Sequence, residues 1–249
     1  MFRLLKALPL TLALAALSIF ATSCGSSSSA QARFVNAIQN TVVYGNGLDV
    51  EVNGTKKFTG VTFPNASAST YTSVAAGSDT ILGLQTGTTT QVFSDTTSLS
   101  SGKQYTLVAT GFANGSGGNV VLLSIPDTNT APASGNVEFR VINASPNGPS
   151  SVDVYIEQTP FNGNLTSPAI SGLAYQQASS YVTLPWNSDG SGWTIIVTAA
   201  GSTTPYNGFN FNTGNIGGQS TDAIRTLVLT DVANSSQMST TPLVLSDLN

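Results

Sequence analysis

The chain has 249 residues, a net charge of −4 at pH 7, and few charged side chains, which make up 8% of it while hydrophobic residues make up 40%. This composition differs from that of a disordered tail and favours a packed protein rich in β-structure. Binding to nucleic acid requires clustered Lys and Arg, which a chain with a pI near 4.5 does not supply, so this class of partner is excluded.

The N-terminus has the layout of an export signal. Arg3 and Lys6 supply positive charge, an apolar run extends from Ala7 to Phe20, and small residues lead up to Cys24. The apolar run is short for a transmembrane helix. We therefore predict a signal peptide at residues 1–23, with a retained membrane anchor as the weaker alternative.

Cys24 is the only cysteine of the chain, and its surroundings resemble the lipobox of bacterial lipoproteins, in which the cysteine is lipidated and begins the mature chain. A Gly/Ser-rich stretch follows, so residues 24–31 are predicted to be the lipidated cysteine and a flexible tether. Gly25 implies export to the outer membrane of a Gram-negative host, and a Gram-positive envelope is the open alternative. Because Ala21 and Ser23 also suit an ordinary signal peptidase, a soluble secreted protein with one free thiol is the rival interpretation.

The two halves of the mature chain repeat one another. Five segments recur in the same order; "ARFVNA" corresponds to "FRVINAS", for example, and "GLDVEVNG" to "SVDVYIEQ". The segment between the halves is rich in Pro, Ser and Thr, which is typical of a linker. We predict two domains, at residues 32–126 and 136–249, joined by a linker at residues 127–135.

Within each half the apolar residues recur with a period of two. Val152, Val154 and Ile156 show the pattern, which is typical of a strand with one buried and one wet face. Short strands punctuated by Gly, Asn and Pro, about seven per half, predict an immunoglobulin-like sandwich. The expected fold class is all-β, with two tandem immunoglobulin-like β-sandwich domains after a lipoprotein signal peptide.

Three motifs of the second half carry a family resemblance: R-x-x-N-A-S, V-D-V-Y and S-S-Y-V-T-L. The residues concerned are Arg140, Asn143, Ala144, Ser145, Val152, Asp153, Val154, Tyr155, Ser180, Tyr181 and Val182. This half resembles a bacterial family of domains of unknown function that occurs in tandem on exported and cell-wall proteins. The first half departs from it, with Ile38 where Ser145 stands and Glu51 where Tyr155 stands. The resemblance implies a sandwich-type domain and a surface location, and it supplies no activity or catalytic residues.

The chain offers little material for catalysis. It contains no histidine, which excludes Ser-His-Asp and Cys-His mechanisms and His-ligated zinc. Paired carboxylates remain as an acid and a base, so a carboxylate-based hydrolase is the weakest alternative. We predict a protein that is not an enzyme, with no catalytic residues and no cofactor.

Asp49 and Asp153 occupy matched positions on strands that are expected to have one solvent-exposed face. Calcium prefers about six to eight oxygen ligands, and no Asp-rich loop accompanies these residues, so we predict no metal site. Each strand is preceded by an arginine. We therefore expect exposed ion pairs between Arg33 and Asp49 and between Arg140 and Asp153.

Aromatic side chains gather in the second half and form the candidate ligand or partner surface. They are Trp186, Trp193, Tyr206, Phe209 and Phe211. An aromatic ring beside polar loop residues can stack on a sugar, although tryptophan more often serves as a buried anchor.

Together these patterns predict a cell-envelope lipoprotein that acts as a surface-tethered structural or interaction module. Its first partner is the membrane, through the lipid anchor, and a glycan or an envelope protein is the further candidate. A carbohydrate-binding module that uses the aromatic surface is the alternative function.

Overall fold

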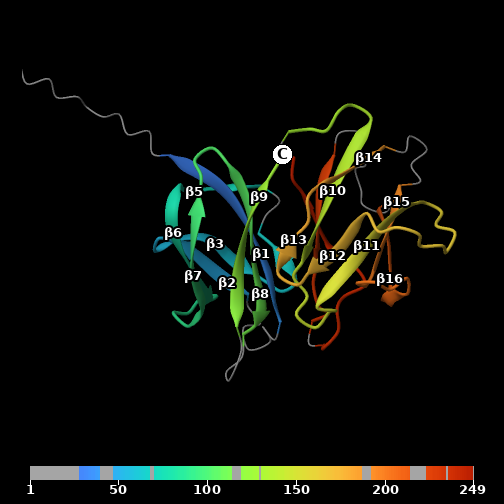
Figure 1. Ribbon diagram of the computed structural model, residues 1–249. Coiled ribbons are helices and arrows are strands. Elements are labelled where there is room, and N and C mark those ends of the chain that lie inside the picture. The colour runs from blue at the N-terminus through green and yellow to red at the C-terminus, as the bar shows by residue number, and fades with distance from the viewer. Residues whose placement is uncertain are drawn as a thin grey trace, which may run out of the picture.

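The computed structural model describes residues 28–39, 47–67, 70–113, 119–128, 130–186, 192–213, 223–233 and 235–248. The predicted signal peptide and Cys24 lie outside the described residues. The described chain is built from strands (Figure 1), which confirms the predicted all-β class. Within these residues, no helix has the length and apolar character needed to cross a membrane.

The first half forms a sandwich of two sheets. Its strands are β1 (Ser29–Gln39), β2 (Leu48–Val52), β3 (Thr55–Val61), β4 (Asn65–Ala66), β5 (Thr72–Ala75), β6 (Gly77–Gln85), β7 (Gln91–Leu99), β8 (Gln104–Phe112) and β9 (Val120–Asp127). One sheet has the order β4-β1-β8-β9, with β5 also paired to β1, and the other has the order β3-β2-β6-β7. β1 runs parallel to β8, so the first strand lies inside its sheet.

The second half has the same arrangement. Its strands are β10 (Asn136–Asn143), β11 (Ser151–Gln158), β12 (Ile170–Ala174), β13 (Gln177–Ala178), β14 (Val182–Pro185), β15 (Trp193–Ala199), β16 (Pro205–Asn212), β17 (Ile224–Leu229) and β18 (Leu243–Ser246). The sheet orders are β13-β10-β17-β18, with β14 also paired to β10, and β12-β11-β15-β16. β10 runs parallel to β17, as β1 runs parallel to β8.

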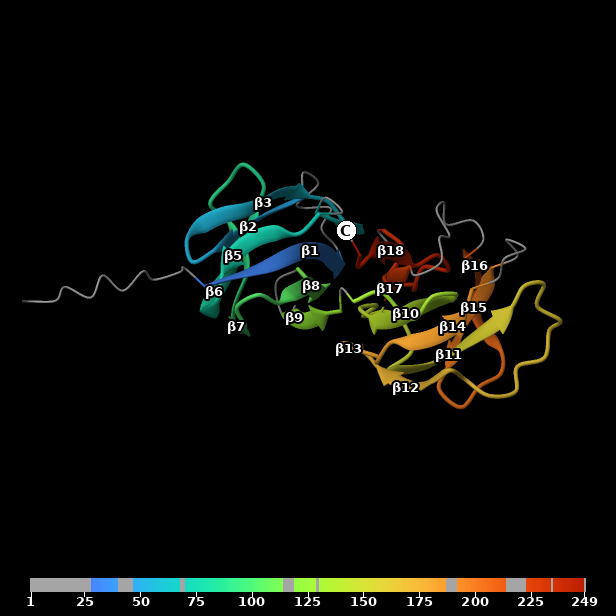
Figure 2. The ribbon, with the colours of Figure 1, turned by 90° about the horizontal axis from the view of Figure 1, so that it is seen from above.

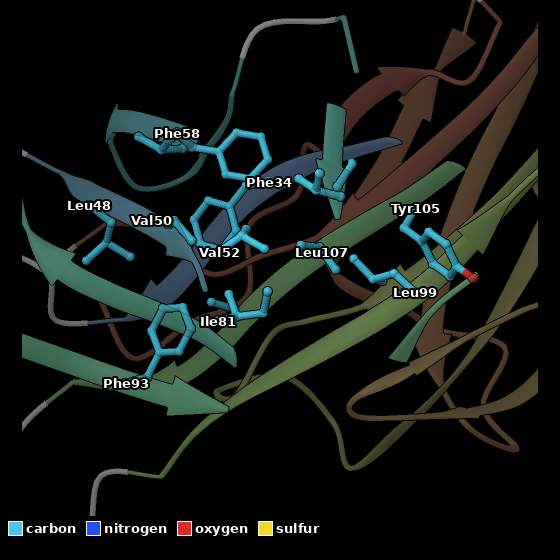
Figure 3. Close-up of a cluster of buried hydrophobic side chains, with 14 of the residues drawn as sticks. Phe34, Leu48, Val50, Val52, Phe58, Ile81, Phe93, Leu99, Tyr105 and Leu107 are labelled. Carbon is cyan, nitrogen blue, oxygen red and sulfur yellow. The ribbon is translucent and has the colours of Figure 1, made fainter. Parts of the chain in front are cut away.

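Each sandwich has its own apolar core. In the first, the Phe34 ring stacks on those of Phe58 and Phe93, with centroids 6.0 and 6.3 Å apart (Figure 3). The second core is made only of residues from the second half, among them Val141 and Phe209. Both cores lie between the two sheets of their own half, as expected for β-sandwiches.

A third apolar cluster joins the two halves, which lie side by side (Figure 2). It combines Val35 and Val108 of the first half with Ile142 and Val228 of the second. The sheet that contains β1 therefore packs face to face on the sheet that contains β10. As a result β1, β8, β10 and β17 are buried on both faces, and the expected wet face is absent from these strands.

The structure moves two predicted boundaries. β1 begins at Ser29, inside the expected tether, because Ala30 is buried in the first core and this part of β1 pairs with β5. β9 ends at Asp127, inside the expected linker, and the Asp127 side chain is fully buried. A carboxylate in this position requires a buried partner, which the second half supplies.

A two-residue turn connects β2 and β3. Asn53 and Gly54 both have positive φ angles, of 50° and 73°. Asn-Gly adopts this left-handed pair of conformations at low cost and matches the twist of the flanking strands. The local sequence therefore sets the β2–β3 hairpin of the β3-β2-β6-β7 sheet. We call this sheet and the β12-β11-β15-β16 sheet the outer sheets, because the interface between the halves is formed by the other two.

Replacing Phe34 with Ala should lower the free energy of unfolding by about 3–5 kcal/mol, because it leaves a cavity between two stacked rings in the first core. Urea unfolding followed by tryptophan and tyrosine fluorescence measures the loss. Val232→Ala is the control, since this side chain is 45% exposed and should change stability by less than about 0.5 kcal/mol. Similar losses in the two variants would contradict the assigned core.

Candidate functional site

The predicted aromatic surface belongs largely to the second core. Phe209 is fully buried, so its prediction as a surface residue is wrong; its place in β16 turns the ring into the sandwich. The remaining members are half-buried and pack against the same core: Trp186, Trp193, Tyr206 and Phe211. The indole N–H of Trp193 donates to the Pro185 carbonyl at 3.3 Å. These rings therefore close the second sandwich.

The predicted pairing of Arg33 with Asp49 is wrong. Asp49 is 2% exposed, and its carboxylate accepts from the Lys56 ammonium at 2.6 Å, from the Gly60 N–H at 3.0 Å and from the Thr86 hydroxyl at 3.0 Å. It ties β2 to the neighbouring β3 and to the turn after β6. The arginine lies on β1, in the other sheet.

The predicted pairing of Arg140 with Asp153 is wrong for the same reason. Asp153 lies on the outer sheet of the second half, where its carboxylate accepts from the backbone N–H groups of Gly172 and Gly201, both at 2.7 Å, and from the Ser171 hydroxyl at 3.3 Å. The aspartate therefore fastens two neighbouring strands of its own sheet.

These hydrogen bonds shift the titration of both carboxyl groups. Burial alone would raise the pKa of Asp153, but the N–H groups of Gly201 and Gly172 outweigh it and hold that pKa below its usual value. The pKa of Asp49 is likewise lowered, because Lys56 and the neighbouring N–H and hydroxyl donors outweigh burial. Both residues are therefore anionic at neutral pH and act as structural acceptors.

The two arginines instead point into the interface between the halves, and each finds its carboxylate on the opposite half. The Arg33 guanidinium donates to Asp247, which follows β18, and to the Ser246 carbonyl. The Arg140 guanidinium donates to Asp127, at the end of β9, and to the Pro126 carbonyl at 2.8 Å. The two sandwiches thus exchange arginine–aspartate pairs.

Hydroxyl groups complete these pairs within each half. Arg33 Nε donates to Thr106 Oγ1 at 2.8 Å, and that hydroxyl donates in turn to Asp127 at 2.7 Å. Arg140 Nε donates to Thr226 Oγ1 at 2.7 Å, and this hydroxyl donates to Asp247 at 2.6 Å. Every threonine therefore links the arginine of its own half to the aspartate of its own half.

Two tyrosines cover the arginines. The Arg33 guanidinium carbon lies 5.0 Å from the centroid of the Tyr71 ring, and that of Arg140 lies 4.8 Å from the Tyr181 ring, so both form cation–π contacts. The Tyr71 hydroxyl donates to Asp127, and the Tyr181 hydroxyl donates to Asp247, both at 2.6 Å. We call these eight residues the arginine–aspartate cluster: Arg33, Tyr71, Thr106, Asp127, Arg140, Tyr181, Thr226 and Asp247.

The cluster is nearly sealed from solvent. The side chains of Arg33 and Arg140 are 1% and 2% exposed, and those of their aspartates are fully buried. Burial, with the charge of Asp127 second, raises the pKa of Tyr71, and burial likewise raises that of Tyr181. Both phenols therefore remain protonated and donate. Burial alone would lower the pKa of Arg140, but the charge of Asp127, chief among its neighbours, outweighs it and keeps the guanidinium charged.

Further contacts extend the interface at its other end. The Thr110 hydroxyl donates to the Ala144 carbonyl at 2.7 Å, and the Gln39 side-chain amide donates to the Val232 carbonyl at 3.1 Å. Both donors lie in the first half and both acceptors in the second. The apolar cluster around Val35 fills the space between this end and the arginine–aspartate cluster.

The arrangement is suited to holding two bodies together. Arginine, threonine and tyrosine donors occupy both buried carboxylates of the cluster. Among the described residues, no three or more His, Cys, Asp or Glu side chains are grouped so that they could hold a metal ion. The cluster neutralises buried charges across the interface between the two halves.

Sequence reasoning identified the two arginines and missed their partners. The missed residues are Tyr71, Thr106, Asp127, Tyr181, Thr226 and Asp247. A signal for them was present, because each lies in a segment that recurs in the other half. The matched segments are "ASASTYTSV" and "QASSYVTL" for the tyrosines, "YTLVATG" and "RTLVLTD" for the threonines, and "VVLLSIPD" and "PLVLSD" for the aspartates. The recurrence of hydroxyl and carboxylate residues at matched positions of these segments was the available pointer.

A comparison with protein families supplies the remaining finding. A family model described as "Domain of unknown function (DUF4397)" matches residues 30–155. The match covers the first sandwich and continues through β10 and most of β11. None of the curated proteins matches the chain.

Replacing Arg140 with Met should lower the free energy of unfolding by about 3–5 kcal/mol, because Asp127 then stays buried without its cation. Chemical denaturation at pH 7 measures this loss. Lys56→Met is the contrast, since the Lys56 side chain is 47% exposed and its pair with Asp49 contributes at most about 1 kcal/mol. Equal losses of unfolding free energy in the two variants would show that the buried Arg140–Asp127 pair matters no more to stability than the exposed Lys56–Asp49 pair.

The lowered pKa of Asp153 predicts how the stability of the fold depends on pH. A carboxyl group whose folded pKa lies below its unfolded value, about 3.9, stabilises the fold above that value, and the contribution disappears as the pH falls through the folded pKa. Asp153→Asn should therefore lower the denaturation midpoint at pH 7 and flatten the fall in stability below about pH 4. Urea titrations between pH 7 and acid measure both effects. If stability falls as steeply below about pH 4 in Asp153→Asn as in the wild type, the Asp153 carboxylate does not stabilise the fold in this way.

Proposed function

The chain belongs to the DUF4397 family, whose description assigns no activity, and on that premise we propose that it is an exported, lipid-anchored protein of the cell envelope. In this proposal the two sandwiches are tandem copies of one domain, locked into a single rigid body. The protein acts as a structural or interaction module that holds a surface at a fixed distance and orientation from the membrane.

The observation that carries the proposal is the exchange of arginine–aspartate pairs between the halves. Arg33 binds Asp247 and Arg140 binds Asp127 within a buried, apolar interface. Two domains linked only by a flexible segment would move independently. The shared buried contacts instead oppose such motion, which is the property a spacer requires.

Tandem copies are supported by sequence and by topology. Corresponding segments occur in the same order, and the strand order of the second half repeats that of the first. The cluster follows the same symmetry, because each arginine contacts a threonine of its own half and an aspartate of the other half. Duplication of one domain explains why both halves present the same face.

Export and anchoring are supported by the N-terminal sequence. A positive start, an apolar run and small residues precede Cys24, and Gly25 follows it. In this proposal Cys24 carries the lipid, and the outer membrane is the destination. Residues after the cysteine up to β1 then form the tether.

A structural role agrees with the use of the buried acids. Asp49 and Asp153 fasten strands of the outer sheets, and Asp127 and Asp247 neutralise arginines. We do not extend the proposal to sugar binding by the aromatic surface, because Phe209 is buried and the other rings pack against the second core.

The lipid anchor is tested by expressing the full chain in a Gram-negative host with an alkyne-tagged fatty acid. We expect the wild-type protein to be labelled and to sediment with outer membranes, and Cys24→Ser to be unlabelled and released into the soluble fraction. Ser26→Ala, which leaves the cysteine intact, is the matched control and should behave as the wild type.

Mass spectrometry of the purified protein separates the remaining possibilities. A mature chain that begins at a diacylated Cys24 supports the proposal. A chain that begins there with a free, maleimide-reactive thiol would establish the secreted alternative, and a chain that retains residues 1–23 would rule out processing.

A further inference from the structure

A cleft opens beside the arginine–aspartate cluster where the two halves meet. Its volume is about 650 Å³, within the range of about 300–1,000 Å³ typical of small-molecule sites. β9 of the first half forms one wall, and the segment from Gln176 to Tyr181 of the second half forms the other. We call this space the seam cleft.

The seam cleft has a neighbour on the far side of the same segment. A second cleft of about 430 Å³ lies between β12 and residues 177–182 and shares Gln177, Ala178, Ser179 and Ser180 with the first. These shared residues therefore separate two adjoining open spaces. An elongated ligand that crosses them would contact both.

The polar groups available to a ligand in the seam cleft are uncharged. Arg140 lines it but is neutralised by Asp127. Within the described residues, the side-chain amides of Gln176 and Gln177 and the Ser180 hydroxyl make no hydrogen bond. Amides and hydroxyls both donate and accept, which suits a ligand rich in hydroxyl groups.

One wall of the cleft is held in a strained conformation. Gln176 has a φ of 65°, in the left-handed region that a residue other than Gly, Asn or Asp rarely adopts. Asn53, in the turn between β2 and β3, and Asn207, within β16, share this conformation, and each precedes a glycine. Gln176 lies in the turn between β12 and β13, and its backbone N–H donates to the Asn143 carbonyl at 2.8 Å, so the surrounding fold holds this conformation in place.

The equivalent position in the first half has a smaller cleft. Beside Arg33, a cleft of about 290 Å³ lies between residues 65–67 and β18. It presents Asn65 and Ser67, but both side chains already accept backbone N–H groups, those of Ala66 and Phe34. The ligand-sized space and the unused amides therefore coincide only on the second side of the interface, within the described residues.

We propose that the seam cleft binds an uncharged, hydroxyl-rich chain, a short neutral glycan. Aliphatic side chains such as Leu123 and Ile125 contact the apolar faces of the sugar rings. The glutamine amides and the Ser180 hydroxyl bind the sugar hydroxyls. This site goes beyond the proposed function, because it assigns a ligand whether or not the protein is lipid-anchored.

The test uses the processed full chain in a sugar-free detergent, with an array of neutral and anionic oligosaccharides followed by calorimetry on the best neutral glycan. Gln176→Gly combined with Gln177→Ala removes both amides, and glycine accepts the left-handed conformation without strain. Loss of two hydrogen bonds should weaken binding about tenfold or more. Asn207→Gly is the matched control, since it changes another left-handed residue outside the cleft and should leave the affinity unchanged.

Nuclear magnetic resonance locates the site independently of affinity. The neutral glycan should shift the amide signals of residues 122–125 and 176–181 and leave those of β16 unchanged. Absence of binding to every neutral glycan, binding to anionic glycans alone, or binding that the double variant leaves intact would each overturn the proposal. None of these outcomes bears on lipidation, which is measured separately.

Discussion

Two guanidinium groups lie between the two β-sandwiches with almost no access to water, and a buried charge left without a partner costs several kcal/mol. Each group meets this demand with a carboxylate from the opposite half, Asp247 for Arg33 and Asp127 for Arg140. The requirement is reciprocal, so separating the halves would break both pairs at once. Replacement by apolar residues can be as stable as a buried ion pair, and the cluster is therefore expected to fix the relative position of the halves more than to add net free energy.

This constraint accounts for features elsewhere in the fold. β1, β8, β10 and β17 are buried on both faces because one face serves a sandwich core and the other the interface. Each arginine also binds a carbonyl near the end of the other half's edge strand, β9 or β18. These hydrogen bonds join the end of each edge strand to the arginine of the opposite half.

The sequence was sufficient to predict the β-class, because period-two runs such as Val152, Val154 and Ile156 are local signals. It was insufficient to pair Arg33 and Arg140, because their partners lie in the other half of the chain. Because every strand was expected to have one solvent-exposed face, the arginines were predicted to pair with exposed aspartates nearby. Packing of two sandwiches face to face is a tertiary property, and it reverses that assignment. The same limit applies to Phe209, whose place in an aromatic, Asn/Gly-rich segment gave no sign that the fold would bury it.

A double-mutant cycle on Arg33 and Asp247 tests the central claim most directly, because the two residues lie near opposite ends of the described part of the chain and meet only if the halves are locked together. The free energies of unfolding of the wild type, Arg33→Met, Asp247→Asn and the double variant give the coupling between the two side chains. The account predicts a coupling of about 2 kcal/mol or more. A coupling below about 0.5 kcal/mol, the level of additivity for independent sites, would contradict it.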